Sequence, residues 1–189
     1  MNFDLPVKLD VGGREYGIRS DYRVILEICT ALNDPDLNQA EKVFAALDMF
    51  YPELDEMPAD DYQEAVEKCF WFISCGEEEQ KKPSPKLVDW EQDFKYIVAP
   101  INRVCGKDVR SIPYDRETNT GGFHWWSFIS CYYEIGECLF AQIVRIRNAK
   151  ARGKPLDKAD KEWLRENRHL VDFKSKYSSE EEDILKNWT

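Results

Sequence analysis

The amino-acid sequence predicts a mainly α-helical protein, a multi-helix domain with an N-terminal β-hairpin and a long central helix. Three observations support this prediction. Apolar residues recur at helical spacing through most of the chain, strict alternation is confined to residues 5–19, and residues 123–149 form one continuous amphipathic stretch. Hydrophobic residues make up 43% of the 189 residues and aromatic residues 13%, which is enough for a packed core.

The hairpin is predicted over residues 5–19, where VKLDVGGREYGI alternates apolar and polar side chains. A two-residue turn at Gly12-Gly13 sets the pairs across the hairpin: Val11 with Arg14, Leu9 with Tyr16, and Val7 with Ile18. An isolated two-stranded hairpin is marginally stable in water. Its apolar face is therefore expected to lie on the following helices or on a partner's sheet.

Three helices are predicted in the next part of the chain. The first has Ser20 as its N-cap and ends near Asn33, the second covers residues 37–50, and the third covers residues 60–75. Gly76 is expected to stop the third helix. The polar segment 77–86 contains two prolines and predicts an internal linker between two halves of one domain.

Further helices are predicted after the linker. VDWEQDFKYIVAPINRVCG has helical spacing, with Pro100 as a kink or a break. A loop over residues 107–122 leads to the long central helix, and a last helix starts with Asp157 as its N-cap. The single domain is predicted to cover residues 1–173, followed by a flexible acidic tail at 174–189. Three apolar residues of this tail are spaced to form a short docking helix: Ile184, Leu185 and Trp188.

The central helix is predicted to carry an apolar face that covers nearly half of its circumference. This face comprises Trp125, Phe128, Ile129, Tyr132, Ile135, Gly136, Leu139, Phe140 and Ile143, with Trp126 and Tyr133 extending it. A face this wide can contact two neighbours at once. The helix is therefore expected at the centre of the fold or of an assembly, and its aromatic residues are candidates for core packing or for an interface.

His124, Cys131 and Cys138 raise the question of a chemical site, because they recur at a spacing of seven. On one helix they would lie ~10.5 Å apart per step at ~1.5 Å rise per residue. Metal ligands all lie ~2.0–2.3 Å from one ion, so no two of them could share it. A site completed by Cys69 or Cys75 is a minor alternative. The sequence predicts no catalytic, cofactor-binding or metal residue, and the six cysteines are expected to be free, mostly buried thiols.

The formal charge of −10 argues against a general nucleic-acid-binding protein, because polyanion binding depends on Lys and Arg. The charge is uneven, since residues 145–168 contain nine basic and four acidic side chains. A small nucleic-acid-binding protein that uses this segment is therefore an alternative. The other interpretation is a solvated helix that pairs with acidic surfaces on neighbouring subunits.

The amino terminus lacks a basic leader followed by an apolar segment, and no stretch has the ~18 consecutive apolar residues of a membrane span. No membrane association is predicted, and the protein is expected in the cytosol.

Three blocks of the sequence resemble the bacteriophage gene-product-fifteen family, encoded among tail morphogenesis proteins. These blocks are GIRSDYRVILEI, WEQDFKYIVAPINRVCGKDVRSI, and the long run that begins FHWWSFISCYYEIGECLFAQIVRIRNAK. The His-Trp-Trp-x-Phe pattern followed by a helix end containing Ile and Arg is the most specific. The likeness covers most of residues 3–173, while the six cysteines are particular to this chain.

This resemblance implies a small, mainly helical tail assembly chaperone. Such proteins bind the tape-measure protein, keep its long helices soluble, help recruit tail tube subunits, and are absent from the mature virion. It implies action in the host cell cytoplasm, self-association into a homo-oligomer, and no enzymatic activity. A structural tail component retained in the virion is the alternative. The matched residues mark fold or interface: Asp21, Arg23, Asp93, His124, Trp125, Trp126, Phe128, Arg145 and Arg147. The predicted partner-binding residues are Trp125, Trp126, Phe128, Tyr132, Tyr133, Arg145 and Arg147.

Overall fold

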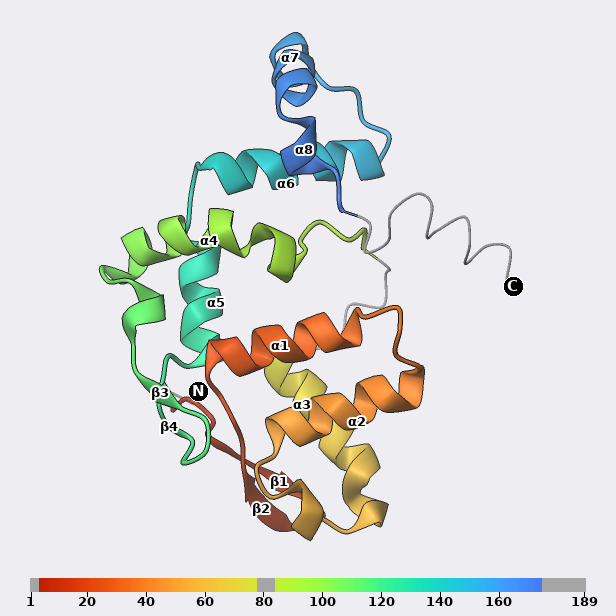
Figure 1. Cartoon of the computed structure of the whole chain (residues 1–189), viewed down its shortest axis with the longest axis vertical. Helices are drawn as coiled ribbons and strands as arrows, with labels where there is room; N and C mark the ends of the chain where they lie inside the picture. The colour runs from red at the N-terminus through yellow and green to blue at the C-terminus, as the bar shows by residue number, and fades with distance from the viewer. Residues whose placement is uncertain (1–3, 78–83, 175–189) are drawn as a thin grey trace.

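The computed structural model describes residues 4–77 and 84–174, and it confirms the mainly α fold with an N-terminal hairpin (Figure 1). The helices are α1 Tyr22–Leu32, α2 Gln39–Phe50, α3 Tyr62–Ile73, α4 Trp90–Cys105, α5 Trp125–Tyr133, α6 Leu139–Ala151, α7 Lys158–Glu166 and α8 Arg168–Val171. The strands are β1 Lys8–Val11, β2 Arg14–Gly17, β3 Tyr114–Asp115 and β4 Thr120–Gly121. Short 3-10 turns are η1 Leu54–Glu56, η2 Ala59–Asp61 and η3 Val109–Ser111.

The β1–β2 hairpin has the register that its sequence predicts, with Val11 opposite Arg14 and Leu9 opposite Tyr16. Apart from Val7, which is 57% exposed, its apolar face is buried against the helices of the same chain: β1 contacts α3, and the Tyr16 ring meets the Tyr51 ring edge-on at 6.4 Å. The N–H of Gly12 also donates to Glu64 Oε2 at 3.0 Å, which ties the turn to α3. The hairpin thus packs on its own helices rather than on a partner's sheet.

The first three helices form close to their predicted ranges. The N-cap of α1 is Asp21 rather than Ser20, because its carboxylate accepts the N–H of Arg23 at 3.0 Å. α2 begins at Gln39 behind a capping box formed by Asn38 and Glu41. Gly76 follows the end of α3 as predicted. The linker prediction falls largely on residues 78–83, which lie outside the described residues.

Pro100 does not break α4, which continues through it from Trp90 to Cys105. Proline removes one backbone hydrogen bond of the helix. Ile97 and Ile101, on either side of it, are fully buried, so packing stabilises the helix on both sides of the proline. The predicted loop at residues 107–122 is also partly ordered, since it contains η3 and the two-residue strands β3 and β4.

The predicted long helix at residues 123–149 is wrong: the chain forms two helices, α5 and α6, joined by a turn. Gly136 in this turn has φ +61°, a left-handed conformation that glycine adopts without a Cβ clash. The guanidinium of Arg103 donates to the carbonyl of Ile135, which fixes the turn against α4. The Cys138 thiol caps α6 by accepting the N–H of Ala141 at 3.4 Å. Apolar periodicity continues across the turn, so it could not reveal the break.

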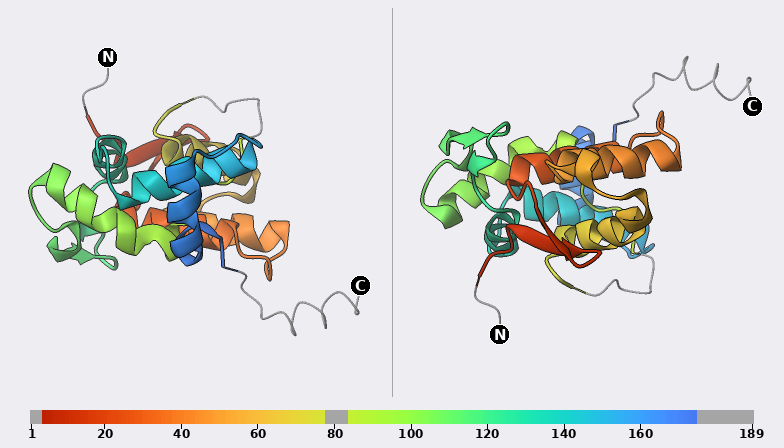
Figure 2. Two further views of the ribbon diagram at one scale, coloured as in Figure 1. Left: turned by 90° about the horizontal axis from the view of Figure 1, so that it is seen from above. Right: turned by 90° about the horizontal axis from the view of Figure 1, so that it is seen from below.

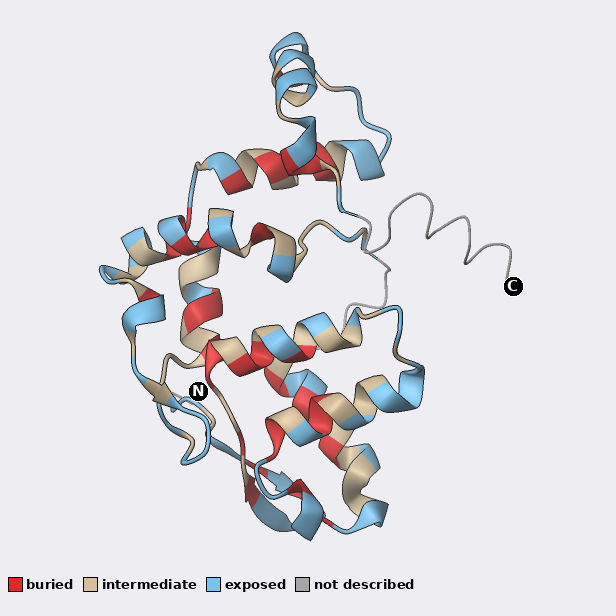
Figure 3. Cartoon of the chain, in the orientation of Figure 1, coloured by how far each residue is buried: buried red, intermediate tan, exposed pale blue. Residues whose placement is uncertain are grey.

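The helices are arranged around α5, which stands between α1 and α4, while α6 lies on the other side of α4 (Figure 1). α8 packs against α6, and the view from above shows it lying across that helix (Figure 2, left). Buried residues line the hairpin, α1 and α5, whereas α7 is mostly exposed (Figure 3). The core therefore combines residues from both sides of the 78–83 segment.

Asp157 caps α7 as predicted, accepting the N–H of Asp160 at 2.8 Å. The predicted acidic tail beyond Lys174 lies outside the described residues.

Candidate partner-binding surfaces

Asp21 and His124 join the start of α1 to the start of α5. Their backbones form an isolated antiparallel bridge. The Asp21 carboxylate is buried, accepts the N–H of Phe123 at 2.7 Å and forms an ion pair with Arg23 at 3.2 Å. Glycine at position 122 permits this approach, because a Cβ there would lie 2.5 Å from an Asp21 oxygen. Asp21, Arg23 and His124 therefore serve to assemble the fold.

Both ring nitrogens of His124 are occupied by the backbone. Nδ1 accepts the N–H of Trp126 at 3.1 Å, so Nε2 carries the proton and donates to the carbonyl of Pro6 at 2.9 Å. Burial lowers the pKa of His124 below its usual 6.5. The helix break also separates Cys138 from the helix that carries Cys131. Among the described residues, no group of three or more His, Cys, Asp or Glu side chains is placed to hold a metal ion.

The indoles of Trp125 and Trp126 cap the end of α3. Trp125 Nε1 donates to the carbonyl of Ile73, and Trp126 Nε1 donates to the carbonyl of Phe72, each at 2.9 Å. The last carbonyls of a helix have no partner within it, and a buried indole needs an acceptor. The paired tryptophans therefore fasten α5 to α3.

Phe128 and Trp125 lie in the core. These two predicted contact residues therefore pack inside the chain rather than at an interface. Phe128 is fully buried and its ring stacks on Tyr22, with centroids 4.6 Å apart and planes 2° from parallel. The Trp125 ring stacks on Phe128 at 5.7 Å. Tyr132 is half-buried beside Trp90 at 5.4 Å, and burial raises its pKa to about 12.

Three side chains of α3 and α5 are called here the aromatic patch: Trp71 and Tyr133, which are exposed, and Trp126, which is half-buried. The Trp71 and Trp126 rings meet edge-on at 5.4 Å across Gly76. Trp71 is 41% exposed and Tyr133 is 69% exposed, so apolar ring surface remains in water. Tyr133 is the most exposed of the predicted aromatic contact residues, while Trp126 and Tyr132 are half-buried.

Arg147 is buried in α6 with all of its donors occupied. Its guanidinium forms a two-pronged ion pair with Asp93 of α4, at 2.5 and 3.0 Å. The remaining N–H groups donate to the carbonyls of Leu87, Leu170 and Val171 at 2.7–3.1 Å. Asp93 and Arg147 thus join α4, α6 and α8, and the guanidinium is enclosed by the fold.

Arg145 is half-exposed and pairs with Asp160 of α7, with one Nη1–Oδ2 distance of 2.6 Å. This hydrogen bond from Arg145 lowers the pKa of the Asp160 carboxyl. Lys150 likewise pairs with Asp172 at 2.6 Å. Three cations of the basic segment, counting Arg147, are therefore balanced by carboxylates of the same chain, which reduces the positive charge available for a polyanion.

All six cysteines are free thiols, as predicted, but only Cys69 is fully buried and the other five are partly buried, so the prediction of mostly buried thiols is wrong. Burial raises the pKa of Cys69 to about 12 and that of Cys29 and Cys75 to about 11. The pKa of Cys105 is also raised to about 12, by burial and by a hydrogen bond with Cys131. The thiolate is the reactive form of cysteine, and little of it forms near neutral pH at such pKa values.

An open groove of about 740 Å³ lies between α1, α2 and the start of α4. Apolar side chains dominate its lining: Tyr22, Leu26, Ala31, Leu37, Met49, Trp90 and Phe94. Glu27 and Arg110 also line it, and each forms an exposed ion pair, with Arg116 and Asp108 respectively. The sequence did not reveal this groove, because its residues belong to the inner faces of separate helices. Only the packing of these helices shows where their apolar faces leave a groove between them.

A sequence profile described as Bacteriophage Gp15 protein matches residues 1–173. The chain belongs to this phage protein family. The Gp15 match confirms the resemblance predicted from the three sequence blocks. No curated protein and no solved structure matches the chain. Within residues 4–77 and 84–174 of this Gp15-family protein, no helix has the length and apolar character needed to cross a membrane.

Proposed function

We propose that this Gp15-family protein is a non-enzymatic phage tail assembly chaperone that binds the tape-measure protein and supports assembly of the tail tube. It acts in the host cell cytoplasm, self-associates, and is absent from the mature virion. The apolar groove between α1, α2 and α4 is the observation that carries this proposal. Family membership supports the phage setting, and the groove supports the chaperone role.

The groove suits an amphipathic helix of a partner. Helix-in-groove recognition places a few apolar side chains of the partner at i, i+3, i+4 and i+7 into a hydrophobic channel. Leu26, Met49 and Phe94 supply such a channel from three different helices. Because apolar side chains dominate the lining, the channel favours apolar surface over charged surface, and long tape-measure helices present apolar surface before the tail is built.

The aromatic patch is the second element of the proposal. Exposed Trp and Tyr side chains are enriched at protein interfaces, since each combines a large apolar ring with one polar group. Trp71, Trp126 and Tyr133 lie on α3 and α5, away from the groove lining. We assign the patch to contacts between copies of this chain, which leaves the groove for the tape-measure protein.

The non-enzymatic part of the proposal draws on the family-matched residues. Asp21, Asp93 and Arg147 are buried in structural ion pairs, and His124 bonds to backbone with both nitrogens. A general base needs a lone pair within reach of substrate. These side chains are committed to joining helices.

Co-expression with the tape-measure protein tests the proposal. Wild-type chain should raise the solubility of the tape-measure protein and co-purify with it. Leu37→Glu places a charge in the groove and should reduce co-purification strongly. Phe44→Glu is the matched control, because Phe44 is 56% exposed on α2 outside the groove lining. Absence of any complex with the wild type, and of any gain in solubility, would sink the proposal.

Mass spectrometry of purified virions tests the assembly role separately. A chaperone should be missing from the particle, whereas a structural tail component should be present in a fixed number of copies. Detection of the chain at such a copy number would replace the chaperone assignment with the structural one.

A further inference from the structure

Cys105 and Cys131 form a pair of neighbouring thiols on two different helices. Cys105 is the last residue of α4, and Cys131 lies in the last turn of α5. Their side chains are joined by a hydrogen bond, and α4 packs directly against α5. The long connection between these helices, which includes η3 and the strands β3 and β4, therefore brings two cysteines that are far apart in the sequence together.

Two further contacts flank this pair. Arg103 and Lys107 lie two residues before and two residues after the cysteine of α4. The Arg103 guanidinium donates to the carbonyl of Ile135, and the Lys107 ammonium lies 5.9 Å from the centre of the Phe123 ring. Phe123 precedes the cysteine of α5 and Ile135 follows it. The end of α4 is thus tied to the chain on both sides of the second cysteine, which keeps the two thiols side by side.

The pair lies near the surface of the protein. Cys105 and Cys131 are each partly buried, and their sequence neighbours Val104, Gly106 and Ser130 are exposed. A small oxidant in solution can therefore approach the thiols. A disulfide also requires two cysteines that already lie close together, because a long separation of the Cβ atoms strains the bond. Access and proximity are combined at this pair.

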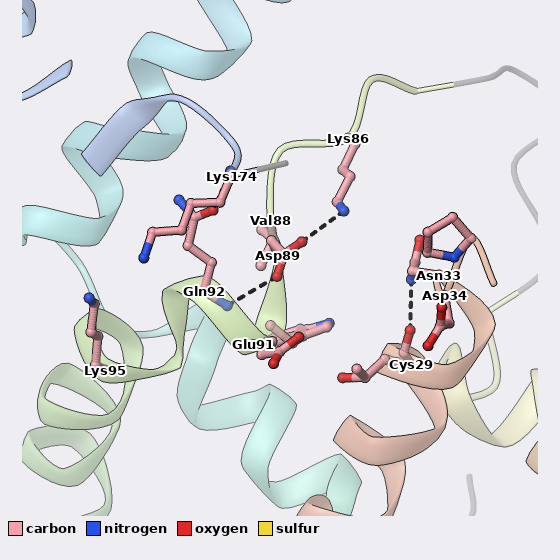
Figure 4. Close-up of a pocket in the computed structure, with 13 residues that line it drawn as sticks. Cys29, Asn33, Asp34, Lys86, Val88, Asp89, Glu91, Gln92, Lys95 and Lys174 are labelled. Carbon is pink, nitrogen blue, oxygen red and sulfur yellow. Dashed lines mark hydrogen bonds and ion pairs between the residues drawn. The ribbon is translucent and has the colours of Figure 1, made fainter. Parts of the chain in front are cut away.

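A second pair of cysteines provides an internal comparison. Cys29 of α1 and Cys69 of α3 are close enough to interact electrostatically. Cys29 lines an open polar pocket of about 690 Å³ between the carboxyl end of α1 and the start of α4 (Figure 4). Cys69 is only 1% exposed and lies in the core. This second pair has proximity without access, so it should stay reduced while the protein is folded.

We infer that Cys105 and Cys131 are a redox modification site, which a small disulfide such as oxidised glutathione converts into an intramolecular disulfide between α4 and α5. The Cys131 thiolate attacks one sulfur of oxidised glutathione, whose S–S bond breaks, and one glutathione thiolate leaves. The Cys105 thiolate then attacks the Cys131 sulfur of this mixed disulfide, and the second glutathione thiolate leaves. The two protein thiols are oxidised by two electrons, oxidised glutathione is reduced to two glutathione molecules, and these take up the two protons that the cysteines release.

The two cysteines act in a fixed order. Burial and the hydrogen bond with Cys131 raise the pKa of Cys105 to about 12, so Cys105 keeps its proton at neutral pH and Cys131 attacks first. Closure of the disulfide waits for deprotonation of Cys105 and should accelerate as the pH rises. Where thiols are kept reduced the site stays open, and it closes where oxidised glutathione accumulates. The inference does not depend on the proposed chaperone role.

Disulfide mapping in the full-length, folded chain tests this inference. The reduced protein is incubated with oxidised glutathione at pH 8 without denaturant and quenched with N-ethylmaleimide. Digestion with trypsin and chymotrypsin then separates Cys131 from Cys138. A Cys105 peptide joined to a Cys131 peptide of the same chain is expected as the main product, with Cys29 and Cys69 unlinked. Glutathione retained on Cys131 as the main product, a link from either residue to another cysteine, or a link between two chains would overturn the inference.

Urea denaturation supplies a second readout. Closing the loop between residues 105 and 131 should raise the urea midpoint by ~1–2 M relative to the reduced protein, and dithiothreitol should reverse this shift. Cys131→Ser should abolish both the link and the shift. Cys75→Ser is the matched control, because Cys75 is also a partly buried thiol and should leave both unchanged. An equal shift in oxidised Cys131→Ser, or no shift in the oxidised wild type, would contradict the inference.

Discussion

α5 and α6 come from one stretch of sequence with uninterrupted apolar periodicity, yet different interactions hold them in the fold. α5 is fixed by aromatic packing, with Phe128 stacked between the rings of Tyr22 and Trp125. α6 buries the apolar side chains of Phe140, Ile143 and Ile146, and it adds a buried ion pair between Arg147 and Asp93. The comparison shows that a buried charge pair can supplement apolar packing in one helix where stacked rings do so in the other, and the two kinds of contact should fail differently.

The largest expected effect comes from breaking the α6 ion pair. Arg147→Ala leaves the Asp93 carboxylate buried without its partner and should lower the free energy of unfolding by ~3–5 kcal/mol. Urea denaturation measures this loss. Arg145→Ala is the matched control on the same helix, because its ion pair lies at the surface and should contribute much less to the free energy of unfolding.

A double substitution sharpens that prediction. Asp93→Leu with Arg147→Met removes both charges together and should be less destabilised than Arg147→Ala alone, because no buried charge is left unpaired. If Arg147→Ala and Arg145→Ala lowered the free energy of unfolding equally, burial of the Asp93–Arg147 pair would not be the cause of the loss.

Truncating the stacked ring of α5 should have a comparable effect through a different cause. Phe128→Ala leaves a cavity in the core and should lower the free energy of unfolding by ~3–5 kcal/mol. Tyr133→Ala on the same helix should change it by less than ~0.5 kcal/mol, because Tyr133 is 69% exposed. The two variants are compared by thermal unfolding at one salt concentration. A similar loss in both would contradict the assignment of Phe128 to the core and Tyr133 to the surface.

Substitutions in the turn between α5 and α6 should lower the free energy of unfolding less than Phe128→Ala does. Gly136→Ala should cost ~1–2 kcal/mol, because φ +61° is unfavourable for residues with a Cβ. A Cβ there meets no atom within 4 Å, so the whole cost arises from the backbone. Gly136→Asn should cost less, since Asn tolerates this conformation better. Denaturant midpoints of the two variants provide the measurement, and a stabilised Gly136→Ala would indicate that the continuous helix is accessible.

The smallest expected effect is a pH dependence at the α5 junction. Burial lowers the pKa of folded His124 below 6.5, so the unfolded chain binds its proton more readily. Stability from neutral His124 is complete above pH 6.5 and decreases as the pH falls towards the folded pKa. His124→Asn keeps an acceptor at the cap but cannot titrate. Urea midpoints at pH 8 and pH 5.5 should differ less in this variant than in the wild type, and an equal difference would contradict the prediction.

Local signals in the sequence predicted most elements. The hairpin register followed from the alternation around Gly12-Gly13, and the start of α7 followed from the cap at Asp157. Both depend on residues close together in the chain. The break at Gly136 was missed because the apolar spacing of the two helices is in phase across the turn. Pro100 was overestimated as a break because packing on both sides of it outweighs one lost hydrogen bond.

Predicted contact residues divide according to burial, which the sequence could not supply. Trp125, Phe128 and Arg147 lie inside the fold, whereas Trp126 and Tyr133 reach the surface. An apolar helical face looks the same in the sequence whether it is covered by its own chain or by another. The groove between α1, α2 and α4 could not be predicted from the sequence either, because it lies where the apolar faces of three helices do not pack fully against one another.

The sequence by itself determined the helical fold class, the hairpin register, the N-cap of α7 at Asp157 and the phage family, because each depends on residue types at short spacing or on a recognisable pattern. Only the tertiary structure decided where the central stretch bends, which aromatic side chains are covered, and that Arg147 is paired with Asp93 rather than free. These outcomes depend on contacts between residues far apart in the chain, such as the 54 positions that separate Asp93 from Arg147.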